Sequence, residues 1–288
     1  MTRSATPPTT QITPDVLLLI VIGAGLGWAW LALQILAMTA TTDFATLGPG
    51  MAVFNRFTQW ADVPEAVRAS LVALCMPTID HAWTLADWSN TFMMWMAMVL
   101  AMMLPSAAPA LTTARSAARG PRMMLAPLVI GYLAAWTGFA LIATALQGGL
   151  AALRYLHSAM APMTDELAAM TMLAAAVYQF TPWKSACLDR CRHPAMLFPS
   201  SVATVTNAGM TGVRLGLDCL GCCWALMTVM FAVGVMNVIW IAALGAVMSI
   251  EKLATDRWPS WIIGGMLATV AAIIIVQSPA GQRLLSLI

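Results

Sequence analysis

Long apolar runs constrain the fold of this chain more than any other feature. A helix needs about 20 predominantly apolar residues to cross the hydrocarbon core of a bilayer. Seven runs approach or exceed this length, at roughly 16–39, 88–106, 125–153, 166–182, 215–236, 237–252 and 259–278. Only 9% of the 288 residues are charged, whereas soluble domains carry about 25%. The pattern predicts an all-α, polytopic transmembrane helix bundle that forms a single integral membrane domain over residues 1–288.

Two of these runs leave the number of spans open. The runs at 166–182 and 237–252 are short, so that either could be tilted, re-entrant or shielded by neighbouring helices. We expect seven spans, with six as the alternative.

Basic residues predict the orientation of the bundle, because cytoplasmic loops carry an excess of lysine and arginine. With a cytoplasmic N-terminus, the inner side holds Arg3, Arg115, Arg119, Arg122, Lys184, Arg190, Arg192, Arg214, Lys252 and Arg257. The outer side then holds Arg56, Arg68, Arg154 and Arg283, the remainder of the 14 basic residues. The asymmetry favours a multi-pass protein with its N-terminus in the cytoplasm.

Two connections between the runs are long. Residues 40–87 form the outer loop, in which Asp62 and Pro64 are typical of a helix start. The apolar spacing that follows predicts an amphipathic helix at the outer membrane interface. Residues 183–213 form the cytoplasmic connection and carry the first cysteine motif.

Five of the six cysteines lie within 37 residues, at Cys187, Cys191, Cys219, Cys222 and Cys223. Spacings of three and four place the members of each group on one face of a helix. The second group is expected to open the fifth span, where a helix N-terminus lowers thiol pKa values and favours thiolates. Both groups lie on the predicted cytoplasmic side, where thiols stay reduced, so a disulfide framework is not expected.

Metal binding and simple packing are the two explanations for these thiols. Buried cysteine can be an inert small apolar residue, although this explains the clustering poorly. Thiolate ligands select Cu(I) and zinc. A zinc site from Cys187, Cys191, Cys219 and Cys222 stays open, but the spacings C-x3-C and C-x2-C-C differ from the usual zinc pairs. His193 is a further candidate ligand because it follows Cys191 closely.

Methionine usage favours copper over zinc. The chain contains 23 methionines, among which Met98 and Met102 are four residues apart in the second run. Met227 follows Cys223 by one helical turn. Thioether sulfur is a soft, neutral ligand suited to Cu(I), so these side chains could extend the site towards the bilayer centre. The alternative is that methionine fills gaps between helices.

Several functions lack their usual sequence features. The predicted spans contain almost no acidic residue, which disfavours proton-coupled pumping, and Asp218 and Glu251 are expected at cytoplasmic helix ends. No nucleotide motif or hydrolase triad is visible, so we expect no enzymatic activity. The basic residues follow topology and predict no nucleic-acid binding; the expected surroundings are the lipid bilayer.

Three stretches carry composite motifs and together cover most of residues 92–252. They are Trp95 to Met98 with Ala101 to Pro105, Tyr178 to Lys184 with Cys187-Leu188 and Cys191 to Pro194, and Gly216 to Met227 with Gly234, Met236-Asn237, Trp240 and Glu251-Lys252. This combination resembles a bacterial family of integral membrane proteins of unknown function described as predicted metal-binding. The resemblance implies an all-helical fold in the bacterial inner membrane and a cysteine-based metal site. Histidine stands at 193 where a serine is more usual in that family, which leaves its ligand role open.

The leading hypothesis is a protein for Cu(I) binding, delivery or homeostasis that supplies a membrane cuproenzyme through the cytoplasmic-side cysteines. The alternative is a non-catalytic accessory subunit or assembly factor of a larger membrane complex. A thiol redox carrier using Cys222 and Cys223 is disfavoured, because a disulfide between neighbours strains the peptide.

Overall fold

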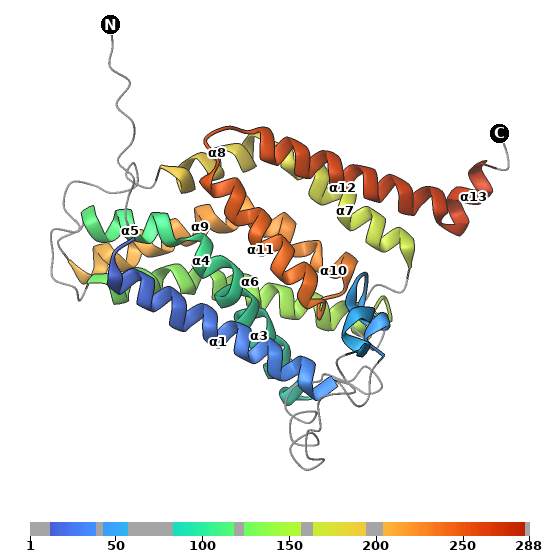
Figure 1. The fold of residues 1–288 in the computed structure, drawn as a ribbon, viewed down its shortest axis with the longest axis horizontal. Helices are drawn as coiled ribbons and strands as arrows, with labels where there is room; N and C mark the ends of the chain where they lie inside the picture. The colour runs from blue at the N-terminus through green and yellow to red at the C-terminus, as the bar shows by residue number, and fades with distance from the viewer. Residues whose placement is uncertain are drawn as a thin grey trace, which may run out of the picture.

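The computed structural model describes residues 12–38, 43–56, 83–117, 124–156, 164–193 and 204–285. Over these ranges the regular elements are all helices, which gather into one bundle (Figure 1). The predicted amphipathic helix of the outer loop lies outside these ranges. The all-α prediction is confirmed for the part of the chain that the structure describes.

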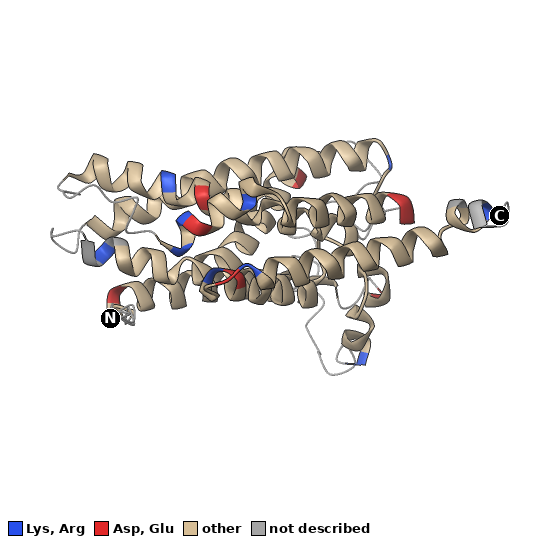
Figure 2. Cartoon of the chain, turned by 90° about the horizontal axis from the view of Figure 1, so that it is seen from above, with Lys and Arg blue, Asp and Glu red and all other residues tan. Residues whose placement is uncertain are grey.

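Four helices are long and apolar enough to cross a membrane, judged by length and composition. They are α1 (Pro14–Met38), α6 (Leu125–Ala152), α9 (Val205–Thr228) with its short continuation α10 (Met230–Val233), and α12 (Trp258–Gln277). Each of these helices corresponds to one predicted span. Lysine, arginine, aspartate and glutamate are sparse along the ribbon (Figure 2). Membrane integration is supported by these four helices; the count of seven spans stays a prediction.

The second predicted span is an interrupted helix. It runs through α3 (Leu85–Met98), a π-helical turn η4 (Val99–Met103), α4 (Leu104–Ser106) and α5 (Ala108–Ala117). Pro105 explains the interruption, because it has no N–H to donate and its ring displaces the carbonyl one turn earlier. A π-turn accommodates such a defect and leaves backbone groups open to other partners.

The other two predicted spans are short. They correspond to α7 (Asp165–Gln179), which is followed at once by α8 (Pro182–Arg192), and to α11 (Val238–Leu253). The remaining short elements are the 3-10 helices η1 (Phe44–Leu47) and η2 (Met51–Arg56) and the C-terminal helix α13 (Pro279–Leu285).

Polar residues fix where many of these helices begin. A side-chain oxygen at the N-cap accepts a backbone N–H of the first turn, which satisfies a donor that the helix leaves open. This role falls to Thr84, Thr164, Thr181, Thr204 and Asn237. The cap at Thr204 starts α9 before the predicted span at 215–236, so the second cysteine group lies inside the helix rather than at its start.

Glycines allow the closest helix pair, α6 against α9. A Cβ on Gly212 would lie 1.9 Å from the Leu128 carbonyl oxygen, and one on Gly216 would lie 2.7 Å from the Tyr132 carbonyl oxygen. Small residues at such positions let two backbones approach in an apolar environment. This close approach sets the position of Tyr132 on α6 relative to Cys219, which lies one turn beyond Gly216 on α9.

Contacts between chain segments agree with the predicted sidedness of the loops. Arg115 at the end of α5 pairs with Asp15 at the start of α1, with Nε to Oδ2 at 3.0 Å. The side chain of Asn237 donates to the Pro49 carbonyl at 3.0 Å, which joins the α10–α11 turn to the start of the outer loop. These two contacts lie at opposite ends of the bundle (Figure 1). Which end faces the cytoplasm stays a prediction.

Candidate metal centre

The first cysteine group lies on α8. Thr181 caps this helix by accepting from the Lys184 N–H at 3.3 Å, and Pro182 occupies its first turn, where a missing N–H is harmless. The buried face of the helix carries Lys184, Leu188 and Cys191. It packs along α9, which carries the second group.

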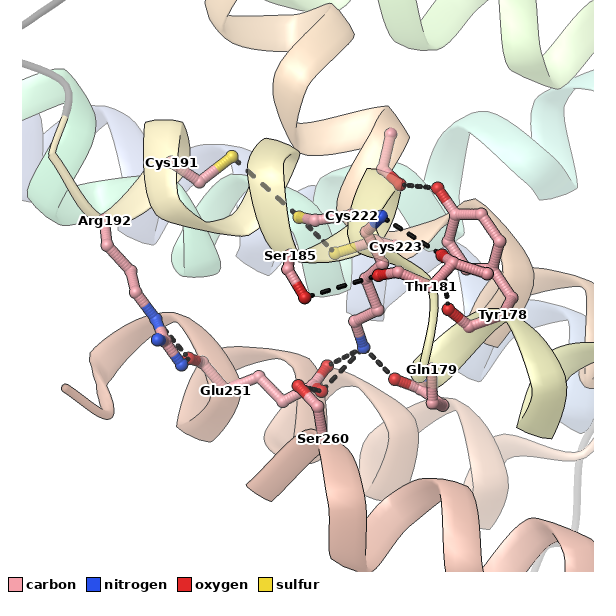
Figure 3. Close-up of polar contacts among 12 residues, drawn as sticks. Tyr178, Gln179, Thr181, Ser185, Cys191, Arg192, Cys222, Cys223, Glu251 and Ser260 are labelled. Carbon is pink, nitrogen blue, oxygen red and sulfur yellow. Dashed lines mark hydrogen bonds and ion pairs between the residues drawn. The ribbon is translucent and has the colours of Figure 1, made fainter. Parts of the chain in front are cut away.

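The two groups of cysteines meet between α8 and α9. The Cys191 Sγ lies 3.9 Å from the Cys222 Sγ, and the Cys222 Sγ lies 3.3 Å from the Cys223 Sγ (Figure 3). Cys219 lies within side-chain interaction range of all three. These four thiols are buried and free of disulfides. Sulfur atoms from both predicted motifs are therefore neighbours in the fold.

These sulfur atoms are arranged as hydrogen-bonding thiols. The Cys222 thiol donates to the Cys219 carbonyl at 3.1 Å, for example. Among the residues with defined positions, no three Cys, His, Asp or Glu side chains are arranged as a ready-made coordination sphere. Metal binding by the cluster therefore requires the thiols to exchange these hydrogen bonds for metal bonds and to release protons.

Cys219 has two polar neighbours that the sequence did not indicate. The Tyr132 hydroxyl on α6 donates to the Met103 carbonyl at 3.0 Å and lies 3.1 Å from the Cys219 Sγ. The Lys252 ammonium on α11 donates to the Cys219 Sγ at 3.0 Å and to the Ser106 hydroxyl at 2.8 Å. The π-turn thus supplies a carbonyl acceptor, and α11 supplies a positive charge beside the thiols.

The expected source of thiolate stabilisation was therefore wrong. Cys219 lies in the middle of α9, because the helix begins at Val205, so the N-terminus of α9 is far from the thiols. A positive charge within hydrogen-bond distance stabilises a thiolate in the same way. Lys252 occupies that position.

Cys187 is less buried than the four thiols of the cluster. Its Sγ is half-buried against Gly221, where an added Cβ would lie 2.5 Å away, and it is 3.4 Å from the Arg190 Nη2. Burial raises the pKa of the Cys187 thiol, and the Arg190 charge opposes that rise. Arg190 is itself held by Asp218, with Nε to Oδ1 at 2.6 Å. Cys187 therefore occupies the rim of the site.

His193 is exposed at the end of α8. Its Nδ1 lies 3.1 Å from the Asp189 carbonyl oxygen, an interaction within its own helix. In the part of the chain that the structure describes, no hydrogen bond links His193 to a cysteine. Its predicted ligand role gains no support from the geometry.

The candidate methionines are buried in the core of the bundle. Met102 packs against Gly245 of α11, where an added Cβ would lie 3.2 Å from the Met102 Cγ. Met98 and Met227 are buried, and Met227 is on α9 one turn beyond Cys223. Within the described ranges no hydrogen bond joins a thioether to a cysteine thiol. A copper path through the methionines stays a prediction.

A buried ion pair links α8 to α11. The Lys184 Nζ lies 2.6 Å from the Glu251 Oε1, with side-chain exposures of 1% and 2%. Gln179 and Ser260 complete the network by bonding Lys184 and Glu251 respectively, and Arg192 donates to the Glu251 carbonyl (Figure 3). Glu251 lies in the last turn of α11, at a helix end as expected, and it is buried there as the partner of Lys184. Gln179, Lys184 and Glu251 all belong to the motifs that carry the family resemblance, which is the sequence feature that could have indicated this network.

A cavity of about 190 Å³ opens beside the cluster. Its lining includes Cys191, Cys219, Tyr132, Lys252, Arg192 and Ser106. The cavity gives a small molecule or ion a route to two of the four buried thiols.

A protein-family model described as PpoB2, copper chaperone, matches residues 92–275. The chain belongs to this family. The matched region contains both cysteine-bearing helices and the residues around the cavity, while α1 precedes it. No curated protein and no solved structure matches the chain.

Membership of the copper chaperone family associates the chain with copper handling, as the sequence predicted. The predicted metal-binding family thus corresponds to one with a functional description, rather than to a family of unknown function. The family description names neither the oxidation state of the copper nor the residues that hold it.

Proposed function

We propose that this protein binds Cu(I) in the membrane at the sulfur cluster of Cys191, Cys219, Cys222 and Cys223, with two of the four as thiolate ligands. The observation that carries the proposal is the meeting of sulfur atoms from α8 and α9, at 3.9 Å between Cys191 and Cys222. Copper is favoured because the chain belongs to the copper chaperone family. Cu(I) is favoured over Cu(II) because soft thiolate ligands select the reduced ion.

Charge balance at the cluster supports a monovalent cargo. One Cu(I) held by two thiolates carries one net negative charge, and Lys252 supplies one positive charge at 3.0 Å from Cys219. A buried charge is tolerated only when it is paired and hydrogen-bonded. Tyr132 and Lys252 meet this requirement for a copper–thiolate centre.

The proposed role is to accept Cu(I) at the cytoplasmic side and to deliver it to a membrane cuproenzyme or a multi-subunit membrane complex. The protein has seven spans in this proposal, crosses the bacterial inner membrane and has a cytoplasmic N-terminus. No catalytic step is required of it. Service as an accessory subunit of the recipient is compatible with this role, and co-purification in mild detergent tests that association.

Metal analysis of the purified protein tests the proposal. The protein is loaded under anaerobic, reducing conditions with equal amounts of Cu(I) and Zn(II), and bound metal is measured by elemental analysis. We expect copper in the wild type and loss of copper in the variant with Cys219→Ser and Cys222→Ser. Cys187→Ser is the matched control, because its thiol lies at the rim, and it should keep its copper.

Two outcomes would contradict the proposal. Copper content unchanged by the double substitution would remove the cluster as the site. Preferential retention of zinc would establish the alternative metal and would refute Cu(I) as the cargo.

A further inference from the structure

The cavity beside the cluster has a polar end and apolar walls. Of the lining residues, Tyr132 and Lys252 contact the Cys219 thiol and Ser106 contacts Lys252, so these polar groups gather at one end, beside that thiol. Alanines, Pro109 and two leucines form the remaining walls. A bare ion needs no apolar wall, whereas small-molecule sites combine apolar walls with a few placed polar groups.

The charges around this cavity favour an anion. Among the residues with defined positions, Lys252 has no carboxylate partner; its ammonium contacts Ser106 and Cys219. The Arg192 guanidinium donates to the backbone carbonyls of Glu251, Thr255 and Asp256. Within the described residues its partners are therefore neutral, and it adds a second positive charge beside the cavity. The lining residues include no aspartate or glutamate.

The volume restricts the size of the ligand. A water molecule takes up about 30 Å³ of liquid, so a cavity of about 190 Å³ holds roughly six waters. That space suits a molecule of the size of a single amino-acid derivative and is far too small for a folded protein domain. The cavity is partly open, so a larger thiol could insert only its thiol-bearing end.

We propose that the cavity is a docking site for the Cu(I) complex of a small anionic thiol. This inference rests on the proposed function and names the form in which copper arrives. A Cu(I) bis-thiolate is an anion, and a carboxylate on the thiol adds to its negative charge. Lys252 and Arg192 attract it, the apolar walls accommodate its carbon skeleton, and the copper reaches Cys191 and Cys219 at the polar end.

Transfer from such a complex needs no oxidant or reductant. In each exchange one Cu–S bond to a cysteine forms and one Cu–S bond to the carrier breaks. The cysteine thiol gives up its proton as it becomes a ligand, and the departing carrier thiolate takes up a proton. Copper remains Cu(I) throughout, and two such exchanges release both carrier molecules as thiols.

The test uses full-length protein in detergent and the Cu(I) complex of N-acetylcysteine, and transfer is followed as the copper that stays with the protein after rapid desalting, measured by elemental analysis. Two variants change the cavity and keep every cysteine: Ala110→Leu fills it, and Lys252→Gln removes its charge. Each has a matched control outside the lining: exposed Ala134→Leu on α6 and exposed Arg214→Gln on α9. Lys252→Arg restores the charge.

We expect Lys252→Gln to slow transfer on the order of tenfold, the lower range of electrostatic steering effects. Ala110→Leu should also slow transfer, because its side chain fills the cavity that the complex must enter. The two controls should match the wild type, and Lys252→Arg should recover part of the rate that Lys252→Gln loses. N-acetyl-S-methylcysteine, which fills the cavity but cannot exchange, should compete with the complex. All cysteines remain, so the final amount of bound copper should be unchanged in Ala110→Leu.

Equal transfer rates in all variants, or no competition by the methylated compound, would overturn the docking site while leaving the copper cluster intact. Failure of the wild type to take up copper from any carrier would refute the proposed function instead. A loss of final copper content in Ala110→Leu would also count against the docking role, because the substitution would then act on the cluster itself.

Discussion

The Lys184–Glu251 pair provides a quantitative test of what holds α8 against the bundle. The two groups are 2.6 Å apart, and both side chains are almost fully buried, at 1% and 2% exposed. Removing one partner of a buried ion pair leaves an uncompensated charge and costs about 3–5 kcal/mol. We therefore expect Glu251→Gln to destabilise the protein severely, although the substitution preserves the shape of the side chain.

The size of the effect can be converted into a melting temperature. For chains of 150–250 residues, 1 kcal/mol shifts the Tm by about 2–4 °C, so Glu251→Gln should lower the apparent Tm by roughly 6–20 °C. Thermal unfolding in detergent, followed by tryptophan fluorescence, measures this shift. Replacing both partners, as Lys184→Met with Glu251→Met, removes both charges and should recover much of the loss.

A surface ion pair on the same helix serves as the control. Arg257 Nη2 lies 3.4 Å from Asp189 Oδ2 on α8, and both side chains are exposed, at 61% and 48%. Exposed pairs contribute about 0–1 kcal/mol, so Arg257→Gln should leave the Tm nearly unchanged. If Glu251→Gln and Arg257→Gln have the same Tm, the buried ion pair is not what holds α8 against the bundle.

Two further predictions concern the glycine contact and the rim cysteine. Gly212→Ala should destabilise the protein by about 1–3 kcal/mol and so lower its Tm, because the added Cβ would lie 1.9 Å from the Leu128 carbonyl oxygen. Gly209→Ala is the control: the nearest atom to its Cβ would be 3.7 Å away, so alanine should be tolerated there. Equal melting of the two variants would refute the close α6–α9 approach. Since the thiolate is the reactive form and burial raises the Cys187 pKa above the ordinary 9.0, alkylation of Cys187, mapped by mass spectrometry, should keep accelerating above that pH. Arg190→Gln removes a charge that lowers this pKa and should shift the profile to still higher pH; a shift to lower pH would contradict the role of Arg190.

The helical class and the cysteine groups could be predicted from the sequence because both depend on local patterns. A long apolar run specifies a helix wherever it lies, and spacings of three or four place thiols on one face. The lengths of the helices were harder to predict. The apolar run at 88–106 contains Pro105, and the structure resolves its effect as a π-turn at Val99–Met103 rather than as a simple end.

The polar partners of the cluster could not be predicted from spacing, since they come from distant parts of the chain. Lys252 is 33 residues from Cys219, and Tyr132 is 87 residues away. Only the packing of α6 and α11 against α9 brings them together. Lys252 was counted as a topology signal, and Tyr132 had no distinguishing context in its apolar run. The extended start of α9 was missed because Val205–Arg214 is less apolar than the predicted span, although Thr204 provides a recognisable cap.

The interruptions of the helices and the polar groups of the interior occur in the same region. The π-turn supplies the Met103 carbonyl to Tyr132, the break between α7 and α8 brings Gln179 to Lys184, and α11 ends at Lys252 and Leu253 beside the cavity. Irregular backbone at membrane depth is tolerated where protein or a water-filled cavity satisfies its polar groups. Continuous helices would have satisfied their own carbonyls and left no acceptor or short helix end near the thiols. The π-turn, the break between α7 and α8 and the C-terminal end of α11 are therefore the structural condition that allows charged groups to reach the cysteines inside an apolar bundle.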